Sequence, residues 1–113
     1  MHDLVNAYYL CWAKRDREGA RALLADDMKF RSQWDKFDDP DAYLEECWGL
    51  RADVQSVMVF ESSVEGDKGF FASEWLVNDG TSFGDAAYIE ARDGKIGRVV
   101  VISAGGNVLQ QFS

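Results

Sequence analysis

The sequence predicts an α+β domain in which N-terminal helices pack against an antiparallel sheet. Two observations lead to this prediction. Before residue 50, apolar side chains recur every three or four positions, which is the period of an amphipathic helix. From residue 54 onward, aliphatic, β-branched and aromatic runs are separated by the turn sequences EGDKG, NDGT and RDGK. With 113 residues, the chain is long enough for one hydrophobic core and too short for two.

The first two helices are expected to form a hairpin. Helix one covers about residues 3–14, and its apolar side chains repeat at every fourth position. This stripe contains Leu4, Tyr8 and Trp12. Helix two covers about residues 17–25 and follows Asp16, whose carboxylate can cap the first turn.

The third helix begins in the acidic stretch FRSQWDKFDDPD. Asp39 followed by Pro40 is a typical helix start, and Gly49 marks the end of this helix. The remaining acids of the stretch are interpreted in the same way, as turn and helix-start residues: Asp35, Asp38 and Asp41. A calcium site is the alternative, but the spacing matches no EF-hand loop. No metal is therefore predicted, and His2, the only histidine, cannot build a histidine metal site or a Ser-His-Asp triad.

Five strands are expected. In the first strand, one face is expected to be exposed to solvent and the other buried. The residues of the buried face alternate with Lys29, Arg31 and Gln33 and are Met28, Phe30, Ser32 and Trp34. The other four form three consecutive hairpins and cover residues 54–61, 69–77, 82–92 and 96–103. Several of these strands are apolar on both faces, which predicts a second buried surface, most simply a homodimer interface. Residues 105–113 are expected to form a loosely attached tail.

Composition limits the partners and the compartment. Twelve Lys and Arg against twenty Asp and Glu give a net charge of −8, which repels nucleic acid and anionic membranes. The N-terminal sequence MHDLVNAYY lacks the features of a secretory signal, and no apolar run approaches the roughly 18 residues of a membrane span. A cytoplasmic protein is therefore expected, in which Cys11 and Cys47 behave as small buried hydrophobes.

Four segments together resemble the nuclear transport factor 2-like superfamily, in its SnoaL-like or polyketide-cyclase-like branch. These segments are AKRD at the end of helix one, ARALLADDMKFRS, DDPDAYLEECW and YIEARDGKIGRVVVIS. The resemblance covers residues 3–104 of one domain that extends over residues 1–113. It implies a curved antiparallel sheet wrapped around the helices as a cone, with a ligand cavity inside and dimerisation through the outer face.

The resemblance also assigns expected roles to two positions of this cavity. Tyr8 matches the position where ketosteroid-isomerase-like members carry a tyrosine that stabilises an oxyanion. The simpler interpretation is that Tyr8 belongs only to the core stripe of helix one. Ser32 matches the position of the general-base aspartate of those isomerases. Because a serine hydroxyl is not ionised at neutral pH, Ser32 is expected to contact a ligand or a local backbone group.

Asp85 is the candidate proton-transfer residue, since it is the only charged member of an apolar strand face. The alternative interpretation of Asp85 is that it lies at the end of a strand and its carboxylate is exposed to solvent. Glu74 could pair with Asp85 across adjacent strands, and Arg98 could neutralise either of them. An epoxide-hydrolase-like site would need such a set of charges, but a structural ion pair is the simpler interpretation.

The sequence therefore predicts a small, largely apolar organic ligand in the cone, bound without a cofactor. The catalytic candidates are Asp85 and Tyr8. The ligand-binding candidates are Trp12, Phe30, Ser32, Trp34, Glu74 and Arg98. An enzyme of this kind would use acid–base chemistry as an isomerase, cyclase, dehydratase or epoxide hydrolase. The alternative is a non-catalytic dimeric binding or interaction protein of the same fold.

Overall fold

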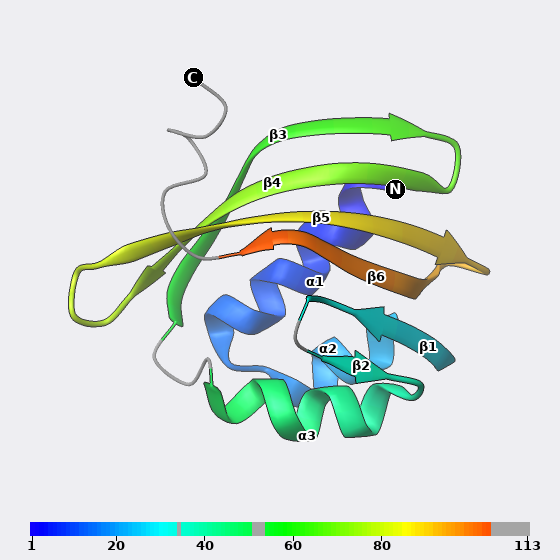
Figure 1. Ribbon diagram of the computed structural model, residues 1–113, viewed down its shortest axis with the longest axis horizontal. Helices are drawn as coiled ribbons and strands as arrows, with labels where there is room; N and C mark the ends of the chain where they lie inside the picture. The colour runs from blue at the N-terminus through cyan, green and yellow to red at the C-terminus, as the bar shows by residue number, and fades with distance from the viewer. Residues whose placement is uncertain (34, 51–53, 105–113) are drawn as a thin grey trace.

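The computed structural model describes residues 1–33, 35–50 and 54–104. Three helices precede most of the sheet: α1 (His2–Lys14), α2 (Arg17–Leu23) and α3 (Pro40–Leu50). The six strands are β1 (Leu24–Arg31), β2 (Lys36–Phe37), β3 (Val54–Glu65), β4 (Lys68–Val77), β5 (Ser82–Arg92) and β6 (Lys95–Ala104). They form one sheet in the order β2-β1-β6-β5-β4-β3 (Figure 1). The prediction of an α+β fold is confirmed.

The sheet is mixed, which corrects the prediction of an antiparallel sheet. The meander from β3 to β6 is antiparallel, as the hairpin turns predicted. β1, however, pairs with β6 in parallel, with Phe30 opposite Val99. The two-residue strand β2 was not predicted, and it pairs antiparallel with the end of β1. A parallel neighbour requires a long connection, and the whole chain from α3 to β5 supplies it.

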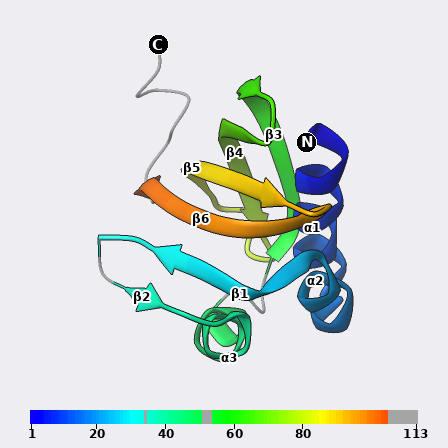
Figure 2. The same ribbon diagram turned by 90° about the vertical axis from the view of Figure 1, so that its right-hand side faces the viewer.

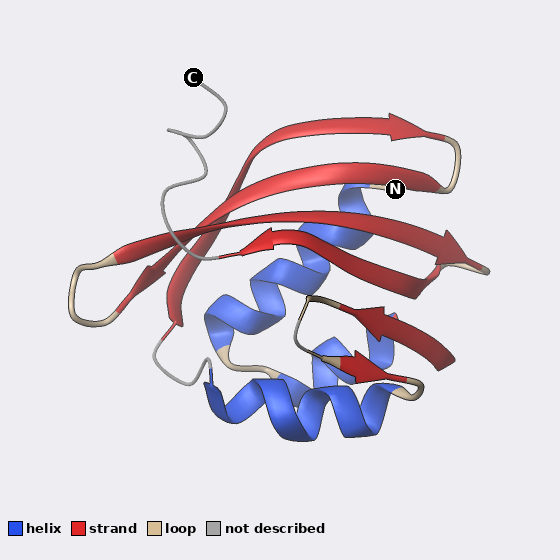
Figure 3. Cartoon of the chain, in the orientation of Figure 1, coloured by secondary structure: helices blue, strands red, loops and turns tan. Residues whose placement is uncertain are grey.

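The sheet curves around the helices (Figures 1 and 2). Register shifts interrupt the pairing of β3 with β4 and of β5 with β6. They lie at Val54/Ser56, Val59/Glu61, Ala86/Ala87 and Glu90/Ala91. Extra residues of this kind bend a strand and increase its twist, so they give the long strands their curvature. The helices occupy the concave side (Figure 3), and α1 packs mainly against β3.

β1 begins earlier than the sequence predicted. Helix two was expected to continue to about residue 25, but Leu24 already has an extended backbone and pairs with Ile96 of β6. Leu24 and Met28 are fully buried in the core. Tertiary packing against β6 therefore overrides the helical spacing of Leu23 and Leu24.

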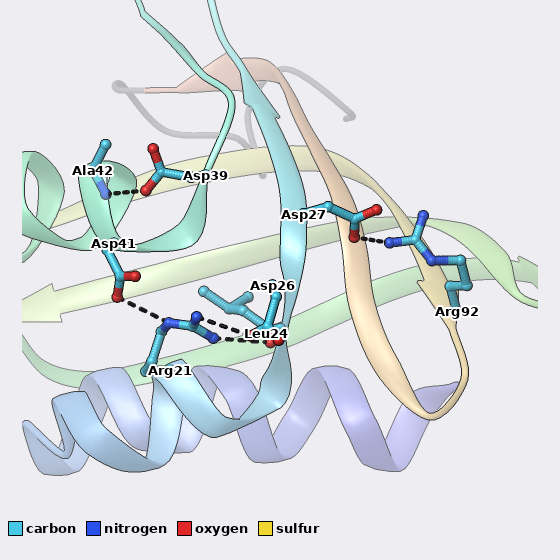
Figure 4. A network of polar contacts seen from close by, with 8 residues as sticks. All are labelled: Arg21, Leu24, Asp26, Asp27, Asp39, Asp41, Ala42 and Arg92. Carbon is cyan, nitrogen blue, oxygen red and sulfur yellow. Dashed lines mark hydrogen bonds and ion pairs between the residues drawn. The ribbon is translucent and has the colours of Figure 1, made fainter.

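Charged side chains join the helices to β1 (Figure 4). Arg21 of α2 donates to Asp41 of α3 at 2.9 Å, to Asp26 at 3.0 Å and to the Leu24 carbonyl at 3.3 Å. These contacts raise the pKa of the guanidinium, with the Asp41 hydrogen bond as the largest cause. Because the carboxylates are largely exposed, the ion pairs fix geometry more than they stabilise the fold.

In the acidic stretch before α3, Asp38 and Asp39 have the structural roles that the sequence predicted. The Asp39 carboxylate accepts a hydrogen bond from the Ala42 N–H at 2.8 Å, which caps the start of α3. The Asp38 carboxylate accepts from the Arg31 guanidinium at 2.8 Å. That hydrogen bond lowers the pKa of Asp38 below its usual range.

The Asp39 cap of α3 should contribute to the free energy of unfolding. Asp39→Ala should lower the free energy of unfolding by about 1 kcal/mol, because the Ala42 N–H loses its acceptor. Asp39→Asn keeps an oxygen in the same place and should retain most of the stability. Urea denaturation followed by circular dichroism measures both. Equal stability of the alanine variant and the wild type would show that the cap is unimportant.

Candidate functional site

A cavity of about 220 Å³ lies between the helices and the concave face of the sheet. Its walls are mainly aromatic. The helices contribute Tyr8, Tyr9 and Trp12 from α1 and Tyr43 and Cys47 from α3. The sheet contributes Phe30, Trp75, Phe83, Ala87, Val99 and Val101, together with Asp85. Ser32 and Asp35 complete the lining from the turn between β1 and β2.

The aromatic rings hold one another in place. Phe30 stacks on Tyr43 with ring centroids 4.5 Å apart, and Trp75 stacks on Phe83 at 5.7 Å. Trp12 meets the edge of Trp75 at 5.7 Å. Aromatic pairs at such distances contribute beyond their buried area, so these walls are expected to be rigid.

A tyrosine pair forms the polar centre of the cavity. The hydroxyl oxygens of Tyr8 and Tyr43 are 2.5 Å apart, so one hydroxyl donates to the other. Both side chains are buried, and burial is the largest cause that raises the pKa of each phenol. The tyrosines therefore stay neutral at physiological pH. Since only one of the two O–H protons is used within the pair, the other can be donated to a ligand.

Asp85 points into the same cavity. It lies opposite Ser73 on β4, and Ser73 is fully buried on the inner face. Its charge contributes, after burial, to the raised pKa values of Tyr8 and Tyr9. The structure thus brings the two predicted catalytic candidates, Asp85 and Tyr8, into one cavity.

Glu74 and Arg98 do not join them, and their assignment as ligand-binding residues is corrected. Glu74 lies opposite Gly84, one position from Asp85, so its side chain points to the outer face of the sheet. Arg98 lies opposite Glu90, and the two side chains approach to 3.9 Å. The predicted pair of Glu74 with Asp85 therefore does not form, because the sheet separates the two carboxylates.

Ser32 has a structural role at the cavity mouth. Its N–H donates to the Asp35 carbonyl at 2.9 Å, and its hydroxyl accepts from the Asp35 N–H at 3.0 Å. Both residues line the cavity, which the sequence predicted for Ser32 but not for Asp35. Trp34, the remaining ligand-binding candidate on this strand, lies outside the described residues.

Two further predicted wall residues are in place. Phe30 and Trp12 are buried in the lining, with 7% and 3% of their surfaces exposed. The buried indole N–H of Trp12 has no acceptor at full hydrogen-bond geometry among the described residues. It still interacts with the Tyr8 hydroxyl, where its hydrogen bond lowers the pKa against the larger effect of burial.

Sequence reasoning missed several lining residues. Tyr43 and Cys47 are four residues apart on α3, and that spacing, which places both on one helix face, was the available signal. For Phe83 and Ala87 the signal was strand alternation, since both lie two positions from Asp85 and so share its face of β5. Tyr9 gave no such signal, because it lies beside the predicted core stripe.

These features define an α+β cone with a small aromatic cavity, and comparison with known proteins identifies the family. The model of the SnoaL-like domain family matches residues 5–99. The chain therefore belongs to the SnoaL-like domain family, as the sequence segments suggested. A search of curated proteins found no match to the chain.

Solved structures with the same fold have low sequence identity to this chain. An NTF2-like protein from Cytophaga hutchinsonii is 13% identical with a TM-score of 0.76, over 99% of this chain and 94% of its own. TerC, co-crystallised with polyporic acid, is 17% identical with a TM-score of 0.74, over 97% and 94%. A protein with a ketosteroid isomerase-like fold from Catenulispora acidiphila, in complex with trimethylamine, is 15% identical with a TM-score of 0.69, over 96% and 90%.

Two findings bear on metals and membranes. Within residues 1–33, 35–50 and 54–104, no three His, Cys, Asp or Glu side chains come together as metal ligands. None of the helices in the described part of the chain has the length and apolar character to cross a bilayer.

The buried tyrosines predict a pH dependence. Because the pKa values of Tyr8, Tyr9 and Tyr43 are raised in the folded state, the unfolded chain loses these protons first as the pH rises. Their contribution to stability should be complete below pH 10 and should decline above it. Absorbance at 295 nm should show suppressed tyrosinate formation at pH 10–11 in the folded protein, relative to the denatured chain. Identical titrations of the two forms would contradict the buried pair.

Proposed function

We propose that this chain binds a small, largely apolar organic molecule in its cavity and transfers a proton to or from it. The observation that supports this proposal is the convergence of Asp85 and the Tyr8–Tyr43 pair on one aromatic cavity. A polar centre inside apolar walls is the usual form of a small-molecule site.

The size of the cavity limits the ligand. Its volume of about 220 Å³ is below the range of about 300–1,000 Å³ that is common for drug-sized ligands. A compact molecule, with one ring or a short branched chain, therefore suits the space. TerC and the Catenulispora acidiphila protein, crystallised with polyporic acid and trimethylamine, support a small organic ligand for this fold.

The proposed chemistry needs only side chains. Tyr8 stays protonated and donates a hydrogen bond to a ligand oxygen, which stabilises negative charge that develops there. Asp85 accepts or returns the proton, as a carboxylate inside a largely apolar cavity can do. Ser32 does not serve as the base, since its hydroxyl accepts the Asp35 N–H in the turn.

Acetophenone is a suitable probe, because it combines one ring with a carbonyl acceptor. Ligand-observed NMR should detect its binding to the wild type, and Val101→Phe should abolish the binding by filling the cavity. Val100→Phe is the matched control, because Val100 lies opposite Tyr88 on the outer face. Binding that survives Val101→Phe would place the ligand elsewhere.

The same samples test proton transfer. In D2O, the wild type should accelerate the exchange of the acetophenone methyl protons, and Asp85→Asn should abolish the acceleration with little change in melting temperature. Exchange at an equal rate in the Asp85→Asn variant would remove Asp85 from the chemistry and leave a binding protein.

We also propose that the outer sheet face joins two copies of the chain. This face exposes large apolar side chains, since Met58, Phe70 and Ile102 each keep more than half of their surface accessible. Phe70 and Ile102 line a hollow of about 610 Å³ together with residues such as Phe60 and Ala86. An apolar surface of this extent on four adjacent strands favours a symmetric partner.

Sedimentation velocity tests this assembly. The wild type should sediment as a dimer at micromolar concentration, whereas Phe70→Glu should give monomers, because it places a charge in the apolar contact. Asn6→Glu adds the same charge on the exposed side of α1 and should leave the dimer intact. A monomeric wild type would refute the proposed interface.

A further inference from the structure

We infer that Tyr9 is a positioning residue that donates a hydrogen bond to the Asp85 carboxylate, and that Ser73 and Trp75 fix Tyr9 in place. This inference rests on the proposed function, because it assigns a partner to the residue that is proposed to transfer the proton. Three features of the inner sheet face lead to it: a fully buried serine, the packing of Tyr9 beside it, and the strand pairing that brings Asp85 to the same place.

Ser73 is the centre of this group. Its side chain is fully buried, and its hydroxyl accepts a hydrogen bond from the indole N–H of Trp75 at 3.1 Å. A serine hydroxyl that accepts one hydrogen bond still has its own proton to donate. Burial raises the pKa of Tyr9 well above its usual value, and a hydrogen bond with Ser73 acts in the opposite direction. A donor to the tyrosine oxygen has this effect, so Ser73 donates to Tyr9.

Packing directs the ring of Tyr9 toward the same strand. Tyr9 is buried, and its ring meets the Trp75 ring edge to face, with centroids 5.8 Å apart. Consecutive residues of an α-helix point about 100° apart, so Tyr9 faces β4 while Tyr8 reaches Tyr43 of α3. The two neighbouring tyrosines of α1 therefore have different partners.

The strand pairing places Asp85 beside this group. Ser73 and Asp85 lie directly opposite each other in the antiparallel pair of β4 and β5. Opposite residues of such a pair share one face, with Cβ atoms about 4.5–5.5 Å apart. After burial, the charge of Asp85 is the largest cause that raises the pKa of Tyr9. Because Tyr9 accepts from Ser73, its own proton can be donated to the carboxylate.

A chain of three donors thus ends at Asp85, formed by the Trp75 N–H, the Ser73 hydroxyl and the Tyr9 hydroxyl. Hydrogen bonds in a chain polarise and strengthen one another. The last donor stabilises the ionised carboxylate and limits its rotation, so Asp85 is kept ready to accept a proton while Tyr8 binds the ligand oxygen. Other elements also contribute titratable groups to the cavity around Asp85, and the variants below leave all of them in place: Tyr8, Tyr43, Cys47 and Asp35.

The carboxyl carbon-13 resonance of Asp85, assigned by its loss in Asp85→Asn, tests the inference in the free protein. Tyr9→Phe removes only a hydroxyl and should move the titration of Asp85 to higher pH by about one unit, because the ionised form loses a donor. Ser73→Ala should give a smaller shift in the same direction, since Tyr9 loses a hydrogen bond that orients it. Tyr88→Phe is the matched control, because it removes a hydroxyl that donates to Glu90 at 2.5 Å on the outer face. The control should leave the Asp85 titration unchanged.

Each other outcome is decisive. An unchanged Asp85 titration in Tyr9→Phe overturns the inference and leaves Tyr9 as a residue that only fills the core. An equal shift in Tyr88→Phe overturns it as well, because the effect would not be local. If Tyr9→Phe does not fold, Ser73→Ala decides in its place, and the absence of a shift overturns the inference. The titration needs no ligand, so a wild type that fails to accelerate acetophenone exchange refutes only the proposed function.

Discussion

The parallel pairing of β1 with β6 is the constraint on which the rest of the structure depends. It ties a segment near the N-terminus to the last described strand, with Leu24 opposite Ile96 and Phe30 opposite Val99. α3 follows β1 and β2 directly, and Tyr43 stacks on Phe30. Without this pairing, α3 and the turn of Ser32 and Asp35 would have no reason to face the concave sheet. The cavity therefore exists because the first and last strands of the chain are neighbours in the sheet.

The core around the cavity contains more buried polar groups than the stability of the fold requires. The hydroxyls of Tyr8 and Tyr43 and the indole N–H of Trp12 are buried among aromatic rings, and Asp85 shares their cavity. Phenylalanine and leucine would fill the same space without the cost of removing polar groups from water. The polar groups are satisfied partly by one another and partly, in this account, by a ligand. The arrangement is that of a binding site that also serves as a core.

The sequence predicted the features that depend on local patterns. Helical spacing gave the positions of the three helices, and the turn sequences gave the four-strand meander. The family resemblance selected Tyr8, and its place as the only charge on an apolar strand face selected Asp85; the structure brings both into one cavity. The parallel partner of β1 was not predictable, because strand alternation carries no information about direction. The short strand β2 has too few residues to show a pattern.

The errors at Glu74 and Arg98 have a common physical origin. Alternation groups side chains by face, but it does not show which face is concave when both are apolar. For Arg98, the register shift at Glu90/Ala91 also changes the face of β6 between Ile96, which is fully buried, and Arg98, which is exposed. Only the pairing itself, with Asp85 opposite Ser73 and Glu74 opposite Gly84, decides between them.

The central claim is that the aromatic cavity is a binding site and not simply a filled core. A crystal structure of the protein soaked with acetophenone tests it most directly. Electron density for the ring is expected between the aromatic walls, with the carbonyl oxygen within hydrogen-bonding distance of Tyr8. A cavity closed by the side chains of Phe83 and Val101, with the compound only on the outer face of the sheet, would contradict it.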